Sequence, residues 1–316
     1  MSSSLLTNSS AMTALQTLRN VSSQLATTQN RISTGQRVST ASDNSAYWSI
    51  ATSMRSDNAA LSAVSDSLGL SAAMVDTEYT ALNTVIGDKE SGLTKLQALL
   101  VEAKTAGIDR TKIQSEVTQI QQDMKLKASS ATINGINWLS IDVTPSSSTA
   151  TPTTFNLVSS YSRVGGTPTI GSITVTTATF ALYTTGGSTT SGILDTVTGN
   201  STTGFASVAT LAIGSLTDSA TDQAKLDGYI NQVTAAINTV ASAAANLGAI
   251  KNRIATNTEF VKNLMDSVDR GIGQLVDADM NAESTRLQAL QTQQQLGVQA
   301  LSIANQNSQS ILSLFK

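Results

Sequence analysis

A seven-residue repeat of apolar side chains runs through residues 226–275 and predicts one long helix. Its unbroken positions are Leu226, Val233, Val240, Leu247, Ile254, Val261, Val268 and Leu275. This period, sustained over many repeats, is typical of coiled coils, because it keeps one apolar stripe facing a partner helix. At 1.5 Å per residue, such a helix reaches roughly 75 Å. We therefore expect a rod rather than a globular helix.

A weaker repeat of the same period occupies the N-terminal flank. Its positions are Tyr47, Met54, Leu61, Leu68, Val75 and Leu82. We expect Gly107 to end this helix and Asp109 to cap a shorter one with an apolar face that includes Ile113 and Val117. Asn134-Gly135 follows and favours a two-residue hairpin turn. The flanks together predict a long antiparallel coiled-coil rod, with core packing expected for Tyr47.

The middle of the chain, residues 144–217, has a different composition and predicts strands and turns. Only two charged residues lie in it, and β-branched residues alternate with turn residues. Ile173–Thr176 and Thr179–Tyr183 are examples of this strand-and-turn composition, and we expect loops over Ser146–Thr149 and Gly186–Ser188. The chain's three prolines all fall here: Pro145, Pro152 and Pro168. The fold class is therefore mainly α, with a small β-rich outer domain inserted between two helical flanks.

The terminal segments, residues 1–42 and 277–316, continue the repeat with thinner apolar stripes. Such stripes hold an isolated helix poorly, because helix stability comes mainly from packing. One interpretation is a solvated tail at each end. We favour the other, in which the tails pair and become ordered by assembly with neighbouring copies. The residues expected in the polymerisation interface are Leu18, Leu25, Ile32, Leu296, Leu301, Ile311, Leu312 and Leu314.

Composition excludes most catalytic chemistry. The chain has no cysteine and no histidine, which rules out disulfides, thiolate nucleophiles and a Ser-His-Asp triad. A net charge of −3 argues against nucleic-acid binding, which needs clustered cations. We predict no catalytic, cofactor-binding or metal-binding residues, and no enzymatic activity. We also expect no secretory signal peptide and no membrane insertion, because no apolar stretch approaches ~20 residues.

Two smaller patterns have a structural and a functional interpretation. Asp277, Asp279 and Glu283 carry the oxygen ligands of a divalent-ion site, but a solvated acidic helix turn explains them better, since calcium-loop spacing is absent. Gly271 and Gly273 interrupt the long helix at a cost of about 1 kcal/mol each relative to alanine. We expect them to permit a bend or close packing rather than to bind phosphate.

Short motifs at both ends of the chain resemble those of the bacterial flagellins. The resemblance covers about residues 1–143 and 218–316 and fails over the middle, where that family varies freely. Each motif alone is weak, but together and in this order they are specific. The matching segments are Arg31–Val38, Ala41–Ala46, Ile50-Ala51, Asn134–Leu139, Gln293–Gln295, Ala304–Gln306 and Ser310–Leu314.

The resemblance implies a filament subunit of the bacterial flagellum, which serves swimming motility and lies outside the cell. Such a subunit is exported unfolded and self-assembles into a helical homopolymer, with an export apparatus, an export chaperone and a capping protein as partners. It further implies three domains. Residues 1–42 and 277–316 line the filament interior as a coiled coil, 43–143 and 218–276 form the helical rod, and 144–217 form the variable surface.

The chain departs from the family pattern at positions linked to immune recognition. Asn44 replaces an acid, and Tyr47 and Trp48 place bulky aromatics in a segment that plant immune receptors read in many flagellins. Ala98 stands near the place where the family often has an arginine used by vertebrate Toll-like receptor 5. The resemblance thus implies poor detection by both receptors. The Ser/Thr-rich middle segment could accept O-linked sugars, and an exposed polar loop is an equal alternative.

Two other functions fit the same pattern. A flagellar hook-associated junction protein shares terminal coiled coils, although the single modest insert and the match at both ends favour a flagellin. A secreted coiled-coil effector or adhesin would also be helical and free of cysteine. It would remain a folded monomer, whereas a filament subunit polymerises.

Overall fold

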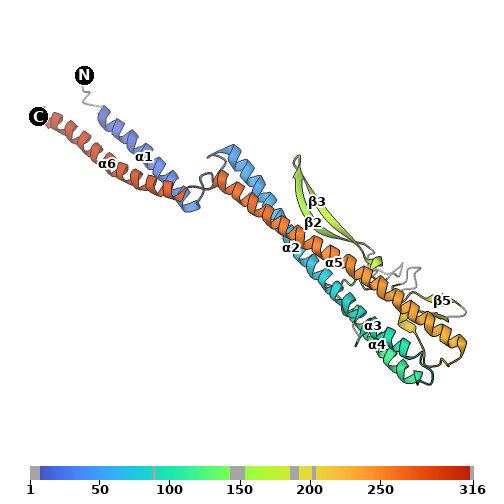
Figure 1. Ribbon diagram of the computed structural model, residues 1–316. Coiled ribbons are helices and arrows are strands. Elements are labelled where there is room, and N and C mark those ends of the chain that lie inside the picture. Colours follow the sequence, from blue (N-terminus) through green and yellow to red (C-terminus); the bar gives the residue numbers. More distant parts are fainter. Residues whose placement is uncertain (1–7, 88–89, 143–153, 186–191, 201–203, 314–316) are drawn as a thin grey trace. The chain divides into compact units, whose positions relative to one another are not determined.

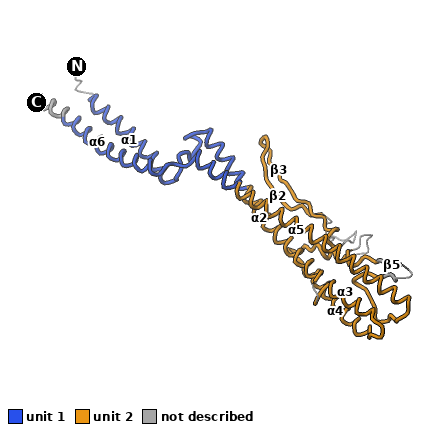
Figure 2. Tube along the Cα trace, viewed as in Figure 1, with its two compact units in different colours: residues 1–59, 264–316 blue, residues 60–263 orange. Residues whose placement is uncertain are grey.

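The chain forms two compact units in the computed structural model, which describes residues 8–87, 90–142, 154–185, 192–200 and 204–313 (Figure 2). Unit 1 comprises residues 1–59 and 264–316, and unit 2 comprises residues 60–263. Each unit combines segments that lie far apart in the sequence. The described part of the chain is mainly helical, which confirms the predicted fold class.

Unit 1 contains α1 (Ser9–Thr34), α6 (Met280–Ser313), the first part of α2 (Ser45–Ile86) and the last part of α5 (Ala220–Val276) (Figure 1). Its hydrophobic core is small. Ala51 of α2 packs against Ile272 and Val276 of α5, and the half-buried Met54 borders them. Gly271 permits this approach, because a Cβ there would lie 2.8 Å from the Met54 methyl carbon. The close packing expected at Gly271 is confirmed.

Unit 2 is a helical bundle of α2, α3 (Gly92–Glu102), α4 (Arg110–Ser130) and α5. The predicted heptad helix is confirmed, since α5 is continuous and its repeat positions from Leu226 to Val261 are all buried. Leu61 to Leu82 of α2 supply the facing stripe. Burying each such aliphatic side chain contributes about 1.5–3 kcal/mol, so this double seam contributes substantially to the stability of the bundle.

The expectation that one helix runs to Gly107 was wrong. α2 ends at Ile86, and α3 intervenes before Gly107, which lies in the α3–α4 turn with φ +80°. The break is made by Gly87 and Gly92, both at φ +69°. A side chain at Gly87 would collide with the carbonyl of Ser91, so only glycine fits. The heptad pattern does not predict this turn, because Leu82 before the break and Leu96 after it keep the same seven-residue spacing.

The other turn predictions are confirmed. The carboxylate of Asp109 accepts a hydrogen bond from the Thr111 N–H at 3.1 Å and caps α4. Asn134 and Gly135 both have positive φ, at 53° and 78°. The residues on either side, Ile133 and Ile136, exchange two backbone hydrogen bonds of 3.0 and 2.9 Å. This is the geometry of a two-residue type I′ hairpin turn.

The insert and the residues just before it form three two-stranded sheets among the described residues. The strands are β1 (Ser140–Asp142) paired with β4 (Tyr183–Thr185), β2 (Thr154–Val164) with β3 (Thr167–Thr176), and β5 (Thr198–Asn200) with β6 (Gly204–Ala206). The strand-and-turn composition is confirmed at residues 173–176, which lie within β3. Segment 179–183 contains both predicted features: the N–H groups of Phe180 and Ala181 donate to the Thr177 carbonyl and close a turn, and Tyr183 begins β4. The predicted loops at 146–149 and 186–188 lie outside the described residues.

A buried arginine ties the α3–α4 turn to the start of α5. The Arg110 side chain is only 6% exposed. It donates to the carbonyls of Ala103 at 2.8 Å and Leu216 at 3.2 Å, and to the Asp218 carboxylate at 2.5 Å. The Arg110 hydrogen bond, together with one from the Gly107 N–H, lowers the pKa of Asp218. The guanidinium therefore joins the α3–α4 turn to the segment before α5, which is about a hundred residues away in the sequence.

Replacing Arg110 by methionine is expected to lower the free energy of unfolding by about 3 kcal/mol, because two carbonyls and a carboxylate lose their donor. Urea denaturation followed by circular dichroism measures this change. Lys112→Met is the matched control. Its ammonium group, in the same turn, is largely exposed, so its loss should stay within about 0.5 kcal/mol. A loss below 1 kcal/mol for Arg110→Met would contradict the proposed clamp.

The expectation that no segment resembles a membrane span needs a correction. By length and composition alone, α5 contains a stretch apolar enough to cross a membrane. The core helix of a soluble protein passes the same test, so this is weak evidence for insertion. In unit 2 the apolar repeat positions of α5, such as Val240 and Leu247, are fully buried against other helices.

Candidate assembly interface

The two terminal helices, α1 and α6, lie side by side and antiparallel in unit 1 (Figure 1). Near one end, the Asn8 amide donates to the Ala304 carbonyl at 3.0 Å. Near the other, Arg31 pairs with Glu283 at 3.0 Å. The pairing expected for the two tails is therefore present within a single chain.

The seam between α1 and α6 is thin. Thr28 and Leu290 are buried in it, at 2% and 4% exposure. Leu18 packs over Gly297, where a Cβ would lie 3.2 Å from a Leu18 methyl carbon. Several other large apolar side chains of the two helices are exposed to solvent. The exposed ones on these two helices are Met12 (65%), Leu15 (38%), Met280 (43%), Leu296 (58%), Val298 (54%) and Ile303 (66%).

The predicted interface residues divide into three groups. Leu18, Leu25, Ile32 and Leu301 are half-buried between the two helices or at their margin, whereas Leu296 is exposed. Ile311 and Leu312 lie on the last turns of α6, but their side chains, like the whole of Leu314, fall outside the described residues.

The predicted interface left out five of these six exposed apolar residues, namely Met12, Leu15, Met280, Val298 and Ile303. Ile303 follows Leu296 by seven residues and so had a detectable signal. Met12 and Val298 lie off the repeat, and only the structure shows their exposure. The exposed apolar surface of α1 and α6 is therefore broader than the heptad stripe.

The acidic residues at the α5–α6 junction have structural partners. Asp279 caps α6 by accepting hydrogen bonds from the N–H groups of Asn281 at 2.9 Å and Ala282 at 3.2 Å. Glu283 is 8% exposed and pairs with Arg31, so the expectation of a fully solvated acidic turn was wrong. Among the residues that the structure describes, no cluster of three potential metal ligands occurs.

A compact turn connects α1 to α2 and is anchored on α5. α1 ends at Gly35, which has φ +71° and whose carbonyl accepts from the Ala278 N–H at 3.0 Å. The Arg37 N–H and guanidinium donate to the carbonyls of Val276 and Leu275. Hydrogen bonds from the backbone and hydroxyl groups of Thr40 and Ser39 lower the pKa of Asp43 and close the turn. The junction is thus held by backbone hydrogen bonds together with those of the Arg37 and Asp43 side chains.

The start of α2 presents three large apolar side chains to solvent. Tyr47 is 41% exposed, Trp48 37% and Ile50 49%. The core position expected for Tyr47 was therefore wrong for the single chain. Asn44, which stands at the departure from the flagellin pattern, accepts a hydrogen bond from the Tyr47 N–H at 3.1 Å and so caps α2. Ala98, the other altered position, is exposed on α3 of unit 2.

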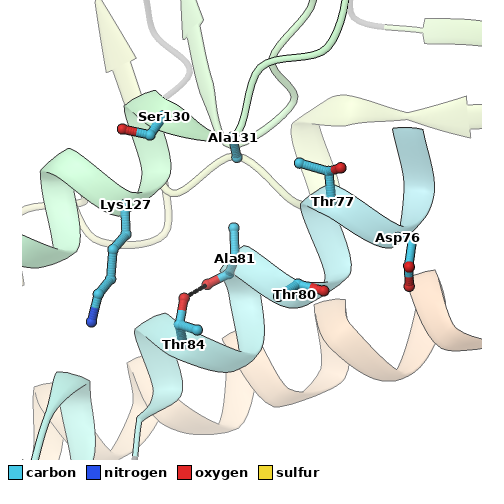
Figure 3. Close-up of a pocket in the computed structure, with 8 residues that line it drawn as sticks. All are labelled: Asp76, Thr77, Thr80, Ala81, Thr84, Lys127, Ser130 and Ala131. Carbon is cyan, nitrogen blue, oxygen red and sulfur yellow. Dashed lines mark hydrogen bonds between the residues drawn. The ribbon is translucent and has the colours of Figure 1, made fainter. Parts of the chain in front are cut away.

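A groove lies between α2 and α4 in unit 2 (Figure 3). Its volume is about 380 Å³, and hydroxyl groups together with the Lys127 side chain line it. Lys127 pairs with Asp123 at 2.8 Å, and Asp76, at the edge of the groove, pairs with Lys251. Because both charges are already engaged, the groove has the character of a bundle surface rather than of an active site.

Paired terminal helices with uncovered apolar side chains, joined to a helical bundle with a small β insert, define a self-assembling structural subunit. Two family models match the chain: the bacterial flagellin N-terminal helical region over residues 5–144, and the C-terminal helical region over residues 230–315. The chain therefore belongs to the bacterial flagellin family. This membership confirms the resemblance seen in the sequence and makes the chain a structural subunit of the flagellar filament.

Curated relatives agree over nearly the full length. Flagellin C of Rhizobium meliloti (strain 1021) is 45% identical over 327 residues, with 99% of each chain covered. A flagellin of Brucella melitensis biotype 1 is 45% identical over 315 residues, again with 99% of each covered. Flagellin A of Rhizobium meliloti is 38% identical over 408 residues, covering 99% of this chain and all of the relative. These relatives do not favour the junction-protein or effector alternatives.

Proposed function

We propose that the chain polymerises into the flagellar filament through its terminal helices, α1 and α6. In this proposal residues 1–42 and 277–316 line the filament interior, 43–143 and 218–276 form a surrounding helical layer, and 144–217 face the outside. The observation that carries it is the apolar surface left uncovered on α1 and α6, where Met12, Leu296 and Ile303 are each more than half exposed.

The energetics favour assembly over two isolated tails. Burial contributes about 25 cal/mol per Å² of apolar surface. Several large apolar side chains on α1 and α6 still expose most of their surface in the single chain, so that surface is available for burial in the filament. The entropic cost of ordering the tails is reduced because α1 and α6 already pair within one chain. Contacts between two different surfaces of a subunit generate a helical polymer when the rotation between neighbours does not close into a ring.

Truncation tests this function directly. A chain without residues 1–34, or one without residues 280–316, should remain a soluble helical protein and fail to extend filament seeds. The full-length chain under the same conditions should polymerise, as followed by light scattering and electron microscopy. Filaments of normal appearance from either truncated chain would overturn the proposal.

Export and localisation form the second part of the proposal. We infer that the chain leaves the cell unfolded through the flagellar export apparatus, with a chaperone before export and a capping protein at the growing tip, and that it acts outside the cell. Its lack of cysteine supports passage between redox compartments. We also propose that the chain has no enzymatic activity, binds no nucleic acid and does not insert into a membrane.

The surface of the chain suggests two further properties. We propose weak detection by the plant receptor and by Toll-like receptor 5, because Tyr47 and Trp48 add bulk beside Asn44, and Ala98 lacks a charged side chain. Strong activation of either receptor by low doses of purified monomer would refute this. We also propose O-linked sugars on the Ser/Thr-rich segment 144–217. An intact mass of native filament protein equal to that of the bare chain would refute them.

A further inference from the structure

The ribbon formed by β2 and β3 in unit 2 has two different halves (Figure 1). At its base, Leu157, Ile173 and Val175 are buried. Beyond the base, every residue from 160 through 171 is exposed or half-buried. Val164 and Ile170 are 72% and 67% exposed, although they are large and apolar. The distal half of the ribbon therefore extends past the core that supports its base.

The strand register places Tyr161 and Ile170 on one face of the distal half, whereas Val164, three residues after Tyr161, lies on the other face. Leu157 is paired with Ile173, and Tyr161 with Ile170. Ile170 and Ile173 are three residues apart in β3, so they lie on opposite faces of the ribbon. A β-bulge between Val158 and Ser160 makes the same switch in β2. The face that carries Tyr161 and Ile170 thus points away from the side on which the base is buried.

Four residues make up this distal surface, which we call the ribbon face: Tyr161, Arg163, Pro168 and Ile170. Arg163 is paired with Pro168 across the ribbon, and its guanidinium donates to the Tyr161 hydroxyl at 3.1 Å. Arg163 is also the one charged residue of segment 154–176. The ribbon face therefore combines exposed apolar side chains with a single positive charge.

A two-stranded ribbon of this kind is marginally stable in water without a third strand or a packed helix. Among the strands that the structure describes, β2 and β3 pair only with each other, so each has an unpaired edge. The pairing of β2 with β3 nevertheless continues to Val164 and Thr167, at the tip of the ribbon. A surface that covers the distal half in the assembled protein would explain this pairing.

We propose that the ribbon face contacts a second copy of this chain in the filament, and that it meets a surface of that copy other than its ribbon. This inference rests on the proposed polymerisation, in which identical chains are permanent neighbours. Ribbon-to-ribbon contact would bring two Arg163 cations together, whereas other surfaces of a chain with net charge −3 offer acidic partners. Contact between two different surfaces also propagates along a helical polymer.

Photo-crosslinking identifies what covers the ribbon. The photoreactive residue p-benzoylphenylalanine in place of Ile170 is introduced into the full-length chain, which is then copolymerised with an excess of unmodified chain. Irradiated filaments should yield covalent dimers that irradiated monomer at the same concentration does not. Mass spectrometry should place the partner peptide outside residues 154–176. The same probe at Thr176, exposed at the base of β3, reports the background of random crosslinking.

Three results would overturn the inference: filaments that give no dimers above the Thr176 background, dimers joined ribbon to ribbon, or crosslinks confined to the probe's own chain. Ile170→Thr gives an independent readout, because threonine keeps the β-branch and removes most of the apolar surface. The critical concentration for polymerisation should rise about tenfold, and an unchanged value would count against the proposal. If the unmodified chain formed no filaments, the proposed function itself would have failed instead.

Discussion

Replacing Ile303 by aspartate is expected to abolish filament growth while the soluble subunit keeps its fold. Ile303 lies on α6 and is 66% exposed, so the single chain tolerates a charge at this position. In the polymer the same side chain is expected to be buried. An unpaired carboxylate there costs several kcal/mol of desolvation in every subunit. Because the contact repeats in every subunit, this cost opposes each addition step.

Ile303→Leu is the matched control for this experiment. It changes the same position of α6 but keeps its apolar surface and adds no charge. We expect the control to polymerise with at most a modest rise in critical concentration, as measured by sedimentation of seeded reactions. Circular dichroism should show the same helicity for both variants. Normal filaments from Ile303→Asp would show that α6 does not supply the subunit contact at this position.

The second large effect is expected at Glu78, a buried acid of α2 in unit 2. Glu78 is only 4% exposed, and one of its carboxylate oxygens accepts a hydrogen bond from the Trp138 N–H at 2.8 Å. The other oxygen is buried and has no hydrogen-bond partner. Burial therefore raises the pKa of Glu78 from 4.5 to about 8, partly offset by the Trp138 hydrogen bond.

The raised pKa of Glu78 fixes the sign of the pH dependence. Between pH 4.5 and about 8 the folded chain holds a proton on Glu78 that the unfolded chain has lost. Unfolding in this range therefore releases a proton from Glu78. The contribution of Glu78 to the free energy of unfolding is fully present below pH 4.5 and is lost as the pH rises toward 8. The slope is about 1.4 kcal/mol of unfolding free energy per pH unit.

Glu78→Gln should remove that slope, because glutamine is neutral at every pH and keeps an oxygen to accept from the Trp138 N–H. Urea denaturation between pH 5 and pH 8 measures it, with Glu102→Gln, an exposed acid of α3, as the matched control. Relative to the unsubstituted chain, the Glu78 variant should gain stability steadily as the pH rises. If the unfolding free energies of Glu78→Gln and of the unsubstituted chain changed in parallel with pH, Glu78 would be ionised in the folded protein.

Local patterns in the sequence predicted the helices but not the contacts between distant residues. The α5 repeat is visible because each apolar position recurs every seven residues and needs no knowledge of its partner. The break at Gly87 is invisible to the same method, since glycine there serves a backbone conformation and not a stripe. The burial of Glu78 depends on Trp138, sixty residues away, and no spacing rule connects the two.

The candidate interface shows the same division. Leu18, Leu25 and Leu296 were predicted because they continue the heptads into the tails. The pairing of Arg31 with Glu283 joins the two ends of the chain, so sequence alone gave Glu283 a solvated role that the structure corrects. The exposure of Met12 and Val298 follows from how α1 and α6 share their thin seam, which the repeat does not specify.

A side-chain-resolution reconstruction of the native filament by electron cryomicroscopy tests the central claim most directly. The account predicts that α1 and α6 of every subunit pack against the same helices of neighbouring subunits, with Met12, Leu296 and Ile303 removed from solvent. A filament in which these three side chains stay exposed, or whose subunits are joined only through residues 144–217, would contradict it.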